Sequence, residues 1–199
     1  MNVETRVSGV IRGLTVGRGD TATDAELLTR YASRGDQAAF AALVRRYGGL
    51  VLGVARRQLA DRQQAEDVFQ ATFLALARSA GRLGTDGVLA NWLYTVAVRQ
   101  ARKARARFAR FARFARRAEL ERAAPAARPD QADPLAAMSG RELVQAIDDE
   151  LARLPDKYRL PVLLCFVLGH SREEAAAQLG WSAGSLKGRL ERGRRRMAS

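Results

Sequence analysis

Residues 171–197 are SREEAAAQLGWSAGSLKGRLERGRRRM, and they predict two short helices joined by a tight turn. Ser171 and Glu174 have the spacing of a capping box, in which both side chains bond to free backbone N–H groups at the start of a helix. Gly180 supplies the turn, because glycine accepts the left-handed backbone conformation that ends many helices. Ser182 is placed to cap the helix that follows.

The second of these helices has an apolar face and a basic outer side. Leu186 and Leu190 lie four residues apart and therefore share one side of the helix. The outer side carries Ser185, Lys187, Arg189, Arg192 and Arg196. Two short helices, a glycine turn and a basic second helix are typical of the helix-turn-helix, whose second helix enters the major groove of DNA. The alternative is a helical hairpin with a solvated basic face.

Composition limits the partners and the compartment. The chain has 199 residues, is 47% hydrophobic and carries a formal net charge of +13. A charge of this size favours nucleic acid, an anionic membrane surface or an acidic protein as a partner. Cys165 is the single cysteine, so no internal disulfide can form, and no stretch approaches the ~20 apolar residues that a membrane span needs. We therefore expect a soluble cytoplasmic protein.

Apolar residues recur at helical spacing almost throughout the chain, which predicts an all-α fold of two small helical domains joined by a flexible linker. A Gly-rich tail is expected over residues 1–22. A domain of four helices with a basic C-terminal extension follows at 23–117. The Ala- and Pro-rich linker occupies 118–138, and the C-terminal domain occupies 139–199.

The first two helices of the C-terminal domain have weaker signals than the last two. Leu143, Ile147 and Leu151 recur at four-residue steps and mark the first helix. Pro161 lies inside the very apolar stretch YRLPVLLCFVL, residues 158–168. Proline in a helix interior removes a hydrogen bond and clashes with the preceding turn, so the second helix either starts near Pro161 or kinks there.

The third helix of the N-terminal domain, expected to start at Asp61, leaves one face outside the predicted core. Asp67, Gln70, Ala71 and Leu74 recur on this face at three- and four-residue steps. A solvated helix face is normally more charged than this. The face is therefore either a docking surface for a partner protein or the side of an ordinary, partly exposed helix.

The fourth helix carries an aromatic residue above a ladder of cations. Trp92, Thr95, Arg99 and Lys103 lie along one stripe of this helix. Stacking on an aromatic ring, combined with neutralised phosphates, suits single-stranded or melted nucleic acid. The alternative is that Trp92 belongs to the core, as large aromatic residues at helical spacing usually do.

A repeat extends this helix. Residues 99–117 hold nine basic residues and no acidic one, and Ala-Arg-Phe occurs three times over residues 106–114. Its period of three differs from the ~3.6 residues of a helical turn, so successive phenylalanines drift around the helix and cannot share one buried face. A basic arm for nucleic acid, a partner-binding helix and a solvated extension all remain open as interpretations.

The order of these pieces resembles the extracytoplasmic-function class of the sigma-70 family of bacterial RNA polymerase sigma factors. Residues 25–59 resemble the first two helices of sigma region 2. AEDVFQATFLALAR, residues 65–78, is similar to the segment that docks on the polymerase. ANWLYTVAVRQARKARAR, residues 90–107, is similar to the segment that recognises and opens the −10 element. Residues 151–197 resemble region 4, which binds the −35 element.

This resemblance implies partners and residue roles. Core RNA polymerase would be bound by Asp67, Gln70 and Leu74. The −10 element would be bound by Asn91, Trp92, Arg99, Arg102 and Lys103. The −35 duplex would be bound by Ser182, Ser185, Lys187, Arg189 and Arg192. The Gly-rich loop at residues 81–87 would help to hold the melted non-template strand, and an anti-sigma factor between the two domains would be a further partner.

The sequence departs from the family pattern at three places. Ala71 stands where an acidic residue is common, which weakens one expected polymerase contact. Gly188 and Gly193 lie inside the recognition helix, where each costs ~1 kcal/mol of helix propensity relative to alanine. The Ala-Arg-Phe repeat has no counterpart in the family pattern.

Other function classes explain less of the sequence. A stand-alone helix-turn-helix regulator would bind duplex DNA as a dimer, and it leaves the face of Asp67 unexplained. An enzyme acting on DNA needs a nucleophile with a base, or carboxylates clustered around a metal. The only histidine, His170, follows Gly169 at an expected helix end, and no such cluster is evident, so we expect neither catalysis nor a metal or cofactor. A membrane-surface protein would need a large apolar face beside its basic segments.

Overall fold

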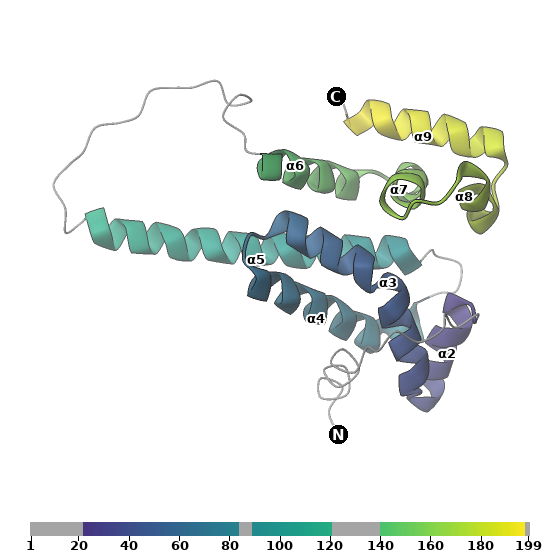
Figure 1. Cartoon of the computed structure of the whole chain (residues 1–199), viewed down its shortest axis with the longest axis horizontal. Helices are drawn as coiled ribbons and strands as arrows, with labels where there is room; N and C mark the ends of the chain where they lie inside the picture. The colour runs from purple at the N-terminus through teal and green to yellow at the C-terminus, as the bar shows by residue number, and fades with distance from the viewer. Residues whose placement is uncertain (1–21, 84–88, 121–139, 198–199) are drawn as a thin grey trace.

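The computed structural model describes residues 22–83, 89–120 and 140–197, which form helices and no strands (Figure 1). This confirms the predicted all-α fold. Almost all of the expected tail, most of the linker and part of the Gly-rich loop lie outside the described residues.

The N-terminal helices begin and end where local capping signals predict. The helices are α2 (Asp24–Arg34), α3 (Gln37–Gln58), α4 (Arg62–Ser79) and α5 (Leu89–Leu120), with a short 3₁₀ turn η1 (Ala80–Arg82) after α4. Thr23 and Glu26 form a capping box at α2, and Gly35 ends that helix with φ of 65°. The carboxylate of Asp36 caps α3, and that of Asp61 caps α4.

The N-terminal core lies between α3, α4 and α5, with α2 packed against α3. Phe40, Phe73 and Tyr94 are among its fully buried side chains. By length and composition alone α3 could cross a membrane, but it is the central helix of this core, and 56% of its apolar window is buried inside the protein. Its apolar character is therefore accounted for by packing.

The C-terminal domain has four helices in the described part of the chain. They are α6 (Gly140–Arg153), α7 (Asp156–Val162), α8 (Arg172–Leu179) and α9 (Ala183–Met197). Pro161 lies inside α7, and the next five residues, η2 (Leu163–Val167), widen into a π-helical turn. There the N–H of Leu168 donates to the carbonyl of Leu163 at 3.0 Å. The predicted disturbance at Pro161 is thus a change of helix type directly after it.

A buried carboxylate joins the two domains. Asp148 on α6 is only 3% exposed. Arg57 on α3 donates to both of its oxygens at 3.0 and 3.1 Å, and the hydroxyl of Tyr94 on α5 donates to its Oδ1 at 2.9 Å. Burial, together with the negative charge of Asp148, raises the pKa of Tyr94 well above its ordinary value, so this hydroxyl remains a hydrogen-bond donor.

A second carboxylate on α6 strengthens this contact. Asp149 accepts from Arg102 Nε at 2.7 Å and from Arg105 Nη2 at 3.0 Å. Partial burial alone would raise the pKa of Asp149, but the hydrogen bonds from the two arginines outweigh it and lower the pKa below the ordinary 3.8. Asp149 is therefore charged at neutral pH and is held by α5.

The first C-terminal helix presents a different side to the core than its apolar residues suggest. Leu151 is buried, whereas Leu143 is 53% and Ile147 is 47% exposed. The side of α6 that carries Asp148 and Asp149 faces α3 and α5 instead. The predicted first helix is present as α6, and its polar contacts with the N-terminal domain, rather than the spacing of its apolar residues, set its rotation.

We expect Asp148→Ala to destabilise the docked arrangement by about 2 kcal/mol. Breaking a fully buried pair costs ~3–5 kcal/mol, but the side chain of Arg57 is 34% exposed and recovers part of its hydration. Thermal unfolding and small-angle scattering would measure the lower stability and the larger radius of the variant. Glu150→Ala is the matched control, because the ion pair of Glu150 is with Arg153 on its own helix. Equal compactness and stability in the two variants would contradict this account.

The two glycines of α9 should respond oppositely to alanine. At Gly188 a Cβ atom would meet only the flexible end of Arg192 at 3.5 Å, so Gly188→Ala should stabilise the protein by up to ~1 kcal/mol through helix propensity. At Gly193 it would lie 3.1 Å from the carbonyl of Tyr158 and 3.3 Å from Val162, so Gly193→Ala should separate α9 from α7 and destabilise the domain. Melting temperatures of both variants check the opposite signs, and two shifts of the same sign would refute the distinction.

Candidate DNA-binding and partner-binding surfaces

The helix-turn-helix has the local geometry that its sequence predicts. The N–H of Ser171 donates to Glu174 Oε2 at 2.8 Å, and the N–H of Glu174 donates to Ser171 Oγ at 3.1 Å. The first of these bonds lowers the pKa of Glu174, so the cap carries a negative charge at the helix N-terminus. Gly180 has φ of 63°, and Ser182 Oγ accepts from the N–H of Ser185 at 3.2 Å.

Small side chains let α8 and α9 approach each other. Ala175 and Ala176 on α8 are buried with Leu186 of α9 and Leu164 of the preceding turn. These contacts fix the angle between the two helices and leave the outer side of α9 to solvent. The recognition helix is therefore held on a small apolar base.

Of the residues expected at the −35 element, Ser182 directly precedes α9 and the other four lie along that helix. Ser182, Lys187 and Arg192 are exposed, whereas Ser185 and Arg189 are half-buried. The guanidinium of Arg189 lies 3.9 Å above the ring of Trp181, a distance at which a cation–π contact orients the flat cation. Trp181 was not among the residues singled out from the sequence. Its position directly after the turn glycine was the only signal for it.

The residues expected to bind polymerase lie on α4. Asp67 and Gln70 are exposed, and Leu74 is half-buried against the main core. Gln63 donates to Asp67 across one helical turn at 3.3 Å. Both exposed side chains remain accessible to a partner protein, while Leu74 belongs partly to the core.

A groove separates this face of α4 from α5. It has a volume of about 610 Å³, and its apolar lining includes Val68, Ala71 and Ala104. Asp67 lines its α4 side, and Lys103 lines its α5 side. One expected polymerase residue and one expected −10 residue thus lie on opposite walls of the same groove.

Three of the five residues expected at the −10 element lie on the outer side of α5. Arg99 and Lys103 are exposed, and Trp92 is half-buried with its ring packed against the core. The two interpretations of Trp92 are therefore compatible, since part of its surface packs and part is accessible. Thr95 from the same predicted stripe donates its hydroxyl to the carbonyl of Asn91 at 2.8 Å.

The other two expected −10 residues are engaged by the C-terminal domain. Arg159 on α7 donates to Asn91 Oδ1 at 2.7 Å. Arg102 is held by Asp149 on α6. The structure therefore divides the predicted set between an open side of α5 and a side that the C-terminal domain covers. No pattern local to the sequence indicates these pairings, which join residues far apart in the chain.

Two stretches of the chain match known protein families. Residues 43–111 match Sigma-70 region 2, and residues 144–197 match Sigma-70, region 4. The first stretch begins within α3 and ends in α5, and the second begins within α6 and ends with α9. Together the two matches cover more than half of the chain.

Individual relatives cover nearly the whole chain. RNA polymerase sigma factor CarQ of Myxococcus xanthus is 34% identical over 159 residues, which are 80% of this chain and 87% of that protein. ECF RNA polymerase sigma factor SigM of Mycobacterium tuberculosis is 30% identical over 177 residues, which are 88% of this chain and 83% of that protein. The solved structure of CnrH in complex with the cytosolic domain of CnrY is 27% identical, covers 88% of this chain and 94% of that one, and has a TM-score of 0.43. With region 2 on α3–α5, region 4 on α6–α9 and the relatives CarQ and SigM, the chain belongs to the extracytoplasmic-function class of the sigma-70 family of RNA polymerase sigma factors.

Proposed function

We propose that this sigma factor brings core RNA polymerase to promoters through three surfaces with different partners. The face of α4 around Asp67 and Gln70 binds the polymerase. The open side of α5 binds the −10 element, and the outer side of α9 binds the −35 element. The observation that carries this proposal is that both family regions occur in order in one chain, each on helices that present a basic or weakly charged side to solvent. Nothing found favours a stand-alone regulator.

At the −35 element, α9 supplies both direct and electrostatic contacts. The first turn of a recognition helix normally meets base edges, so Ser182 and Ser185 are assigned to the bases. Lys187 and Arg192 lie further along and are assigned to phosphates or to guanine. Arg189 is assigned to the same duplex, and its stacking on Trp181 limits its freedom before DNA arrives.

At the −10 element, the open side of α5 suits an unpaired strand. The accessible part of Trp92 offers a surface on which a base can stack, and Arg99 and Lys103 can neutralise neighbouring phosphates. The Gly-rich loop at residues 81–87 lies partly outside the described residues, so its assigned share in holding the strand rests on the family resemblance.

Asn91 and Arg102 can contact DNA only after the C-terminal domain leaves α5. Their present partners are Arg159 and Asp149. We therefore assign the docked arrangement to the free protein and an opened arrangement to the promoter complex. An anti-sigma factor that inserts between the domains would have to break the same contacts, including the pair of Arg57 with Asp148.

The protein acts by binding and needs no catalytic residue or cofactor, and its place of action is the cytoplasm, where RNA polymerase works. Transcription by core polymerase with this protein on a library of genomic fragments tests the proposal and identifies the promoter. Failure to bind core polymerase at low salt would refute it.

Two single substitutions should separate polymerase binding from DNA binding. Asp67→Ala should weaken binding to core polymerase, because it removes an exposed carboxylate from the proposed docking face, and should leave −35 recognition by the holoenzyme unchanged at saturating polymerase. Lys187→Ala should leave core-polymerase binding unchanged and lower the affinity for promoter DNA roughly five- to tenfold. The slope of the logarithm of DNA affinity against the logarithm of salt concentration should become shallower by about one. Titration of labelled core polymerase and of promoter DNA measures the two affinities.

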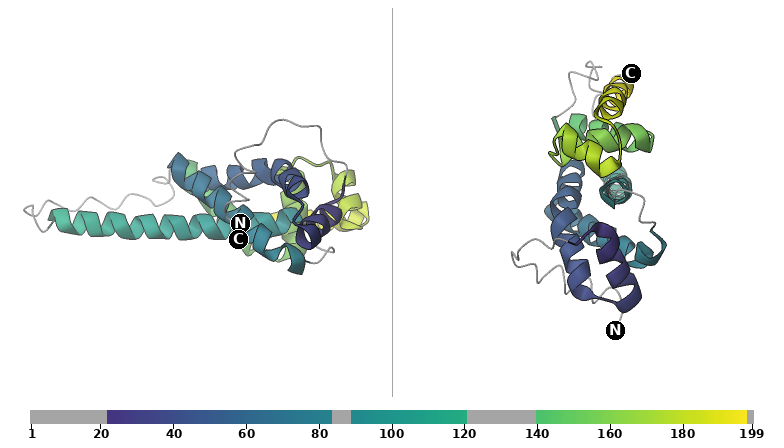
Figure 2. Two further views of the ribbon diagram at one scale, coloured as in Figure 1. Left: turned by 90° about the horizontal axis from the view of Figure 1, so that it is seen from below. Right: turned by 90° about the vertical axis from the view of Figure 1, so that its right-hand side faces the viewer.

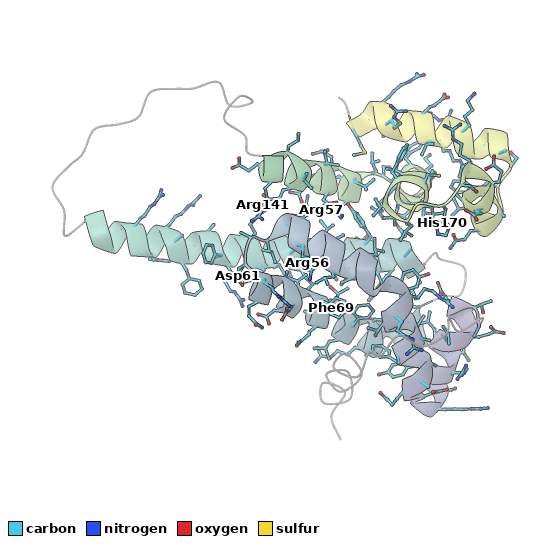
Figure 3. All side chains as sticks on the ribbon, in the orientation of Figure 1. Arg56, Arg57, Asp61, Phe69, Arg141 and His170 are labelled. Carbon is cyan, nitrogen blue, oxygen red and sulfur yellow. The ribbon has the colours of Figure 1, made fainter. Side chains whose placement is uncertain are left out.

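Arg141→Ala is the matched control for lost positive charge, because Arg141 is exposed on α6 and away from α9 (Figure 3). It should change neither affinity by more than about twofold. Loss of polymerase binding in Lys187→Ala, or equal loss of DNA affinity in Arg141→Ala, would contradict the assignment of the surfaces.

A further inference from the structure

The C-terminal part of α5 projects from the body of the protein. Figures 1 and 2 show that α5 continues well beyond the body of the protein. We call residues 106–114, which hold the Ala-Arg-Phe repeat, the arm. Every residue of the arm is exposed, and Phe108, Phe111 and Phe114 are 61%, 67% and 72% exposed. Large aromatic side chains gathered on one exposed element mark an interaction site more often than chance exposure does.

The charge around the arm disfavours contact with a second copy of the chain. Residues 99–117 carry nine basic residues and no acidic one, so two arms brought together would repel each other. The chain's own described helices do not shield the three rings from water, because each ring remains more than 60% exposed. The partner must therefore be anionic and must also offer flat or apolar groups.

Each Ala-Arg-Phe triplet of the repeat contributes one cation and one aromatic ring. A helix turns by about 100° per residue, so each step of three residues moves forward ~4.5 Å and back around the axis by ~60°. Arg107, Arg110 and Arg113 wind around the helix in parallel with the phenylalanines, and each ring has an arginine one residue before it. A single nucleic-acid strand has the matching unit, since every nucleotide carries one phosphate and one base.

The arm is continuous with the proposed −10 surface. Trp92, Arg99, Lys103 and Arg110 follow each other at steps of seven, four and seven residues, which keeps them on one side of α5. Arg107 and Arg110 also line the groove beside Lys103. A strand that runs along the open side of α5 would therefore reach the arm without crossing a gap or an acidic residue of that helix.

We propose that the arm binds single-stranded DNA next to the −10 element, with its phenylalanine rings against bases and its arginines on phosphates. This inference rests on the proposed function of α5. It adds three phenylalanine rings and three arginines to the proposed −10 surface. It assigns a role to the one motif that has no counterpart in the family pattern.

The first experiment uses the full chain and a fluorescent single-stranded oligonucleotide of mixed sequence, with the matching duplex as a second probe. The combined variant Phe108→Ala, Phe111→Ala and Phe114→Ala should bind the single strand at least tenfold more weakly, because stacking contributes ~1–3 kcal/mol per base, and should bind the duplex almost unchanged. Alanine has a higher helix propensity than phenylalanine, so α5 should stay helical, which circular dichroism checks.

Two further variants test the specificity of this result. The combined variant Arg107→Gln, Arg110→Gln and Arg113→Gln should lower the salt slope of single-strand binding by about two, since each phosphate contact contributes ~0.7. The combined variant Leu143→Ala and Ile147→Ala removes exposed apolar surface from α6 instead and should bind the single strand like the unaltered protein.

The same variants in the holoenzyme separate this inference from the proposed function. The phenylalanine variant should bind core polymerase normally and form open promoter complexes that dissociate faster. Unchanged single-strand affinity, or an equal loss for duplex DNA, would overturn the inference. Loss of core polymerase binding with unchanged oligonucleotide binding would also overturn it and would make the arm a protein-docking helix. Failure of the unaltered protein to bind core polymerase would instead refute the proposed function.

Discussion

The arrangement of the two domains depends on one buried carboxylate. A charged group removed from water is tolerated only when partners compensate it, and Asp148 has Arg57 from α3 and Tyr94 from α5. These partners come from two different helices of the N-terminal domain, so the carboxylate fixes both the position and the rotation of α6. The exposure of Leu143 and Ile147 is a direct result, because α6 cannot bury its apolar side and its acidic side against the same surface.

The same constraint determines which DNA-binding residues are accessible. With Asp148 in place, Asp149 lies on Arg102 and Arg105, and α7 brings Arg159 onto Asn91. Asp149 on α6 thus occupies Arg102, which, on the proposed function, contacts DNA in the promoter complex. Opening the domains would expose these charges again, and their rehydration offsets part of the lost contacts. Binding to the polymerase and to both promoter elements must supply the remaining free energy of opening.

Features set by neighbouring residues were predictable, and features set by distant residues were not. The capping box of Ser171 with Glu174 spans three residues, so sequence alone placed the start of α8. Arg57 and Asp148 are 91 positions apart, and no local pattern links them. Gly188 and Gly193 also cannot be told apart from the local sequence, because both lower helix propensity equally. They differ in the space available for a Cβ atom, since Gly193 lies against α7 and Gly188 does not. Trp181 beneath Arg189 was missed for a similar reason, since stacking depends on the angle between α8 and α9.

The helix α5 has one side that the C-terminal domain covers and one side that is open to solvent. One side of it, with Asn91 and Arg102, is tied to the C-terminal domain, while the side with Arg99 and Lys103 is open. Because both sides belong to one continuous helix of 32 residues, DNA on the open side does not have to wait for the domains to separate. On the proposed assignment, promoter contact then proceeds in two stages. The open side engages first, and Asn91 and Arg102 join once α6 and α7 have left α5 and α9 has reached the −35 element.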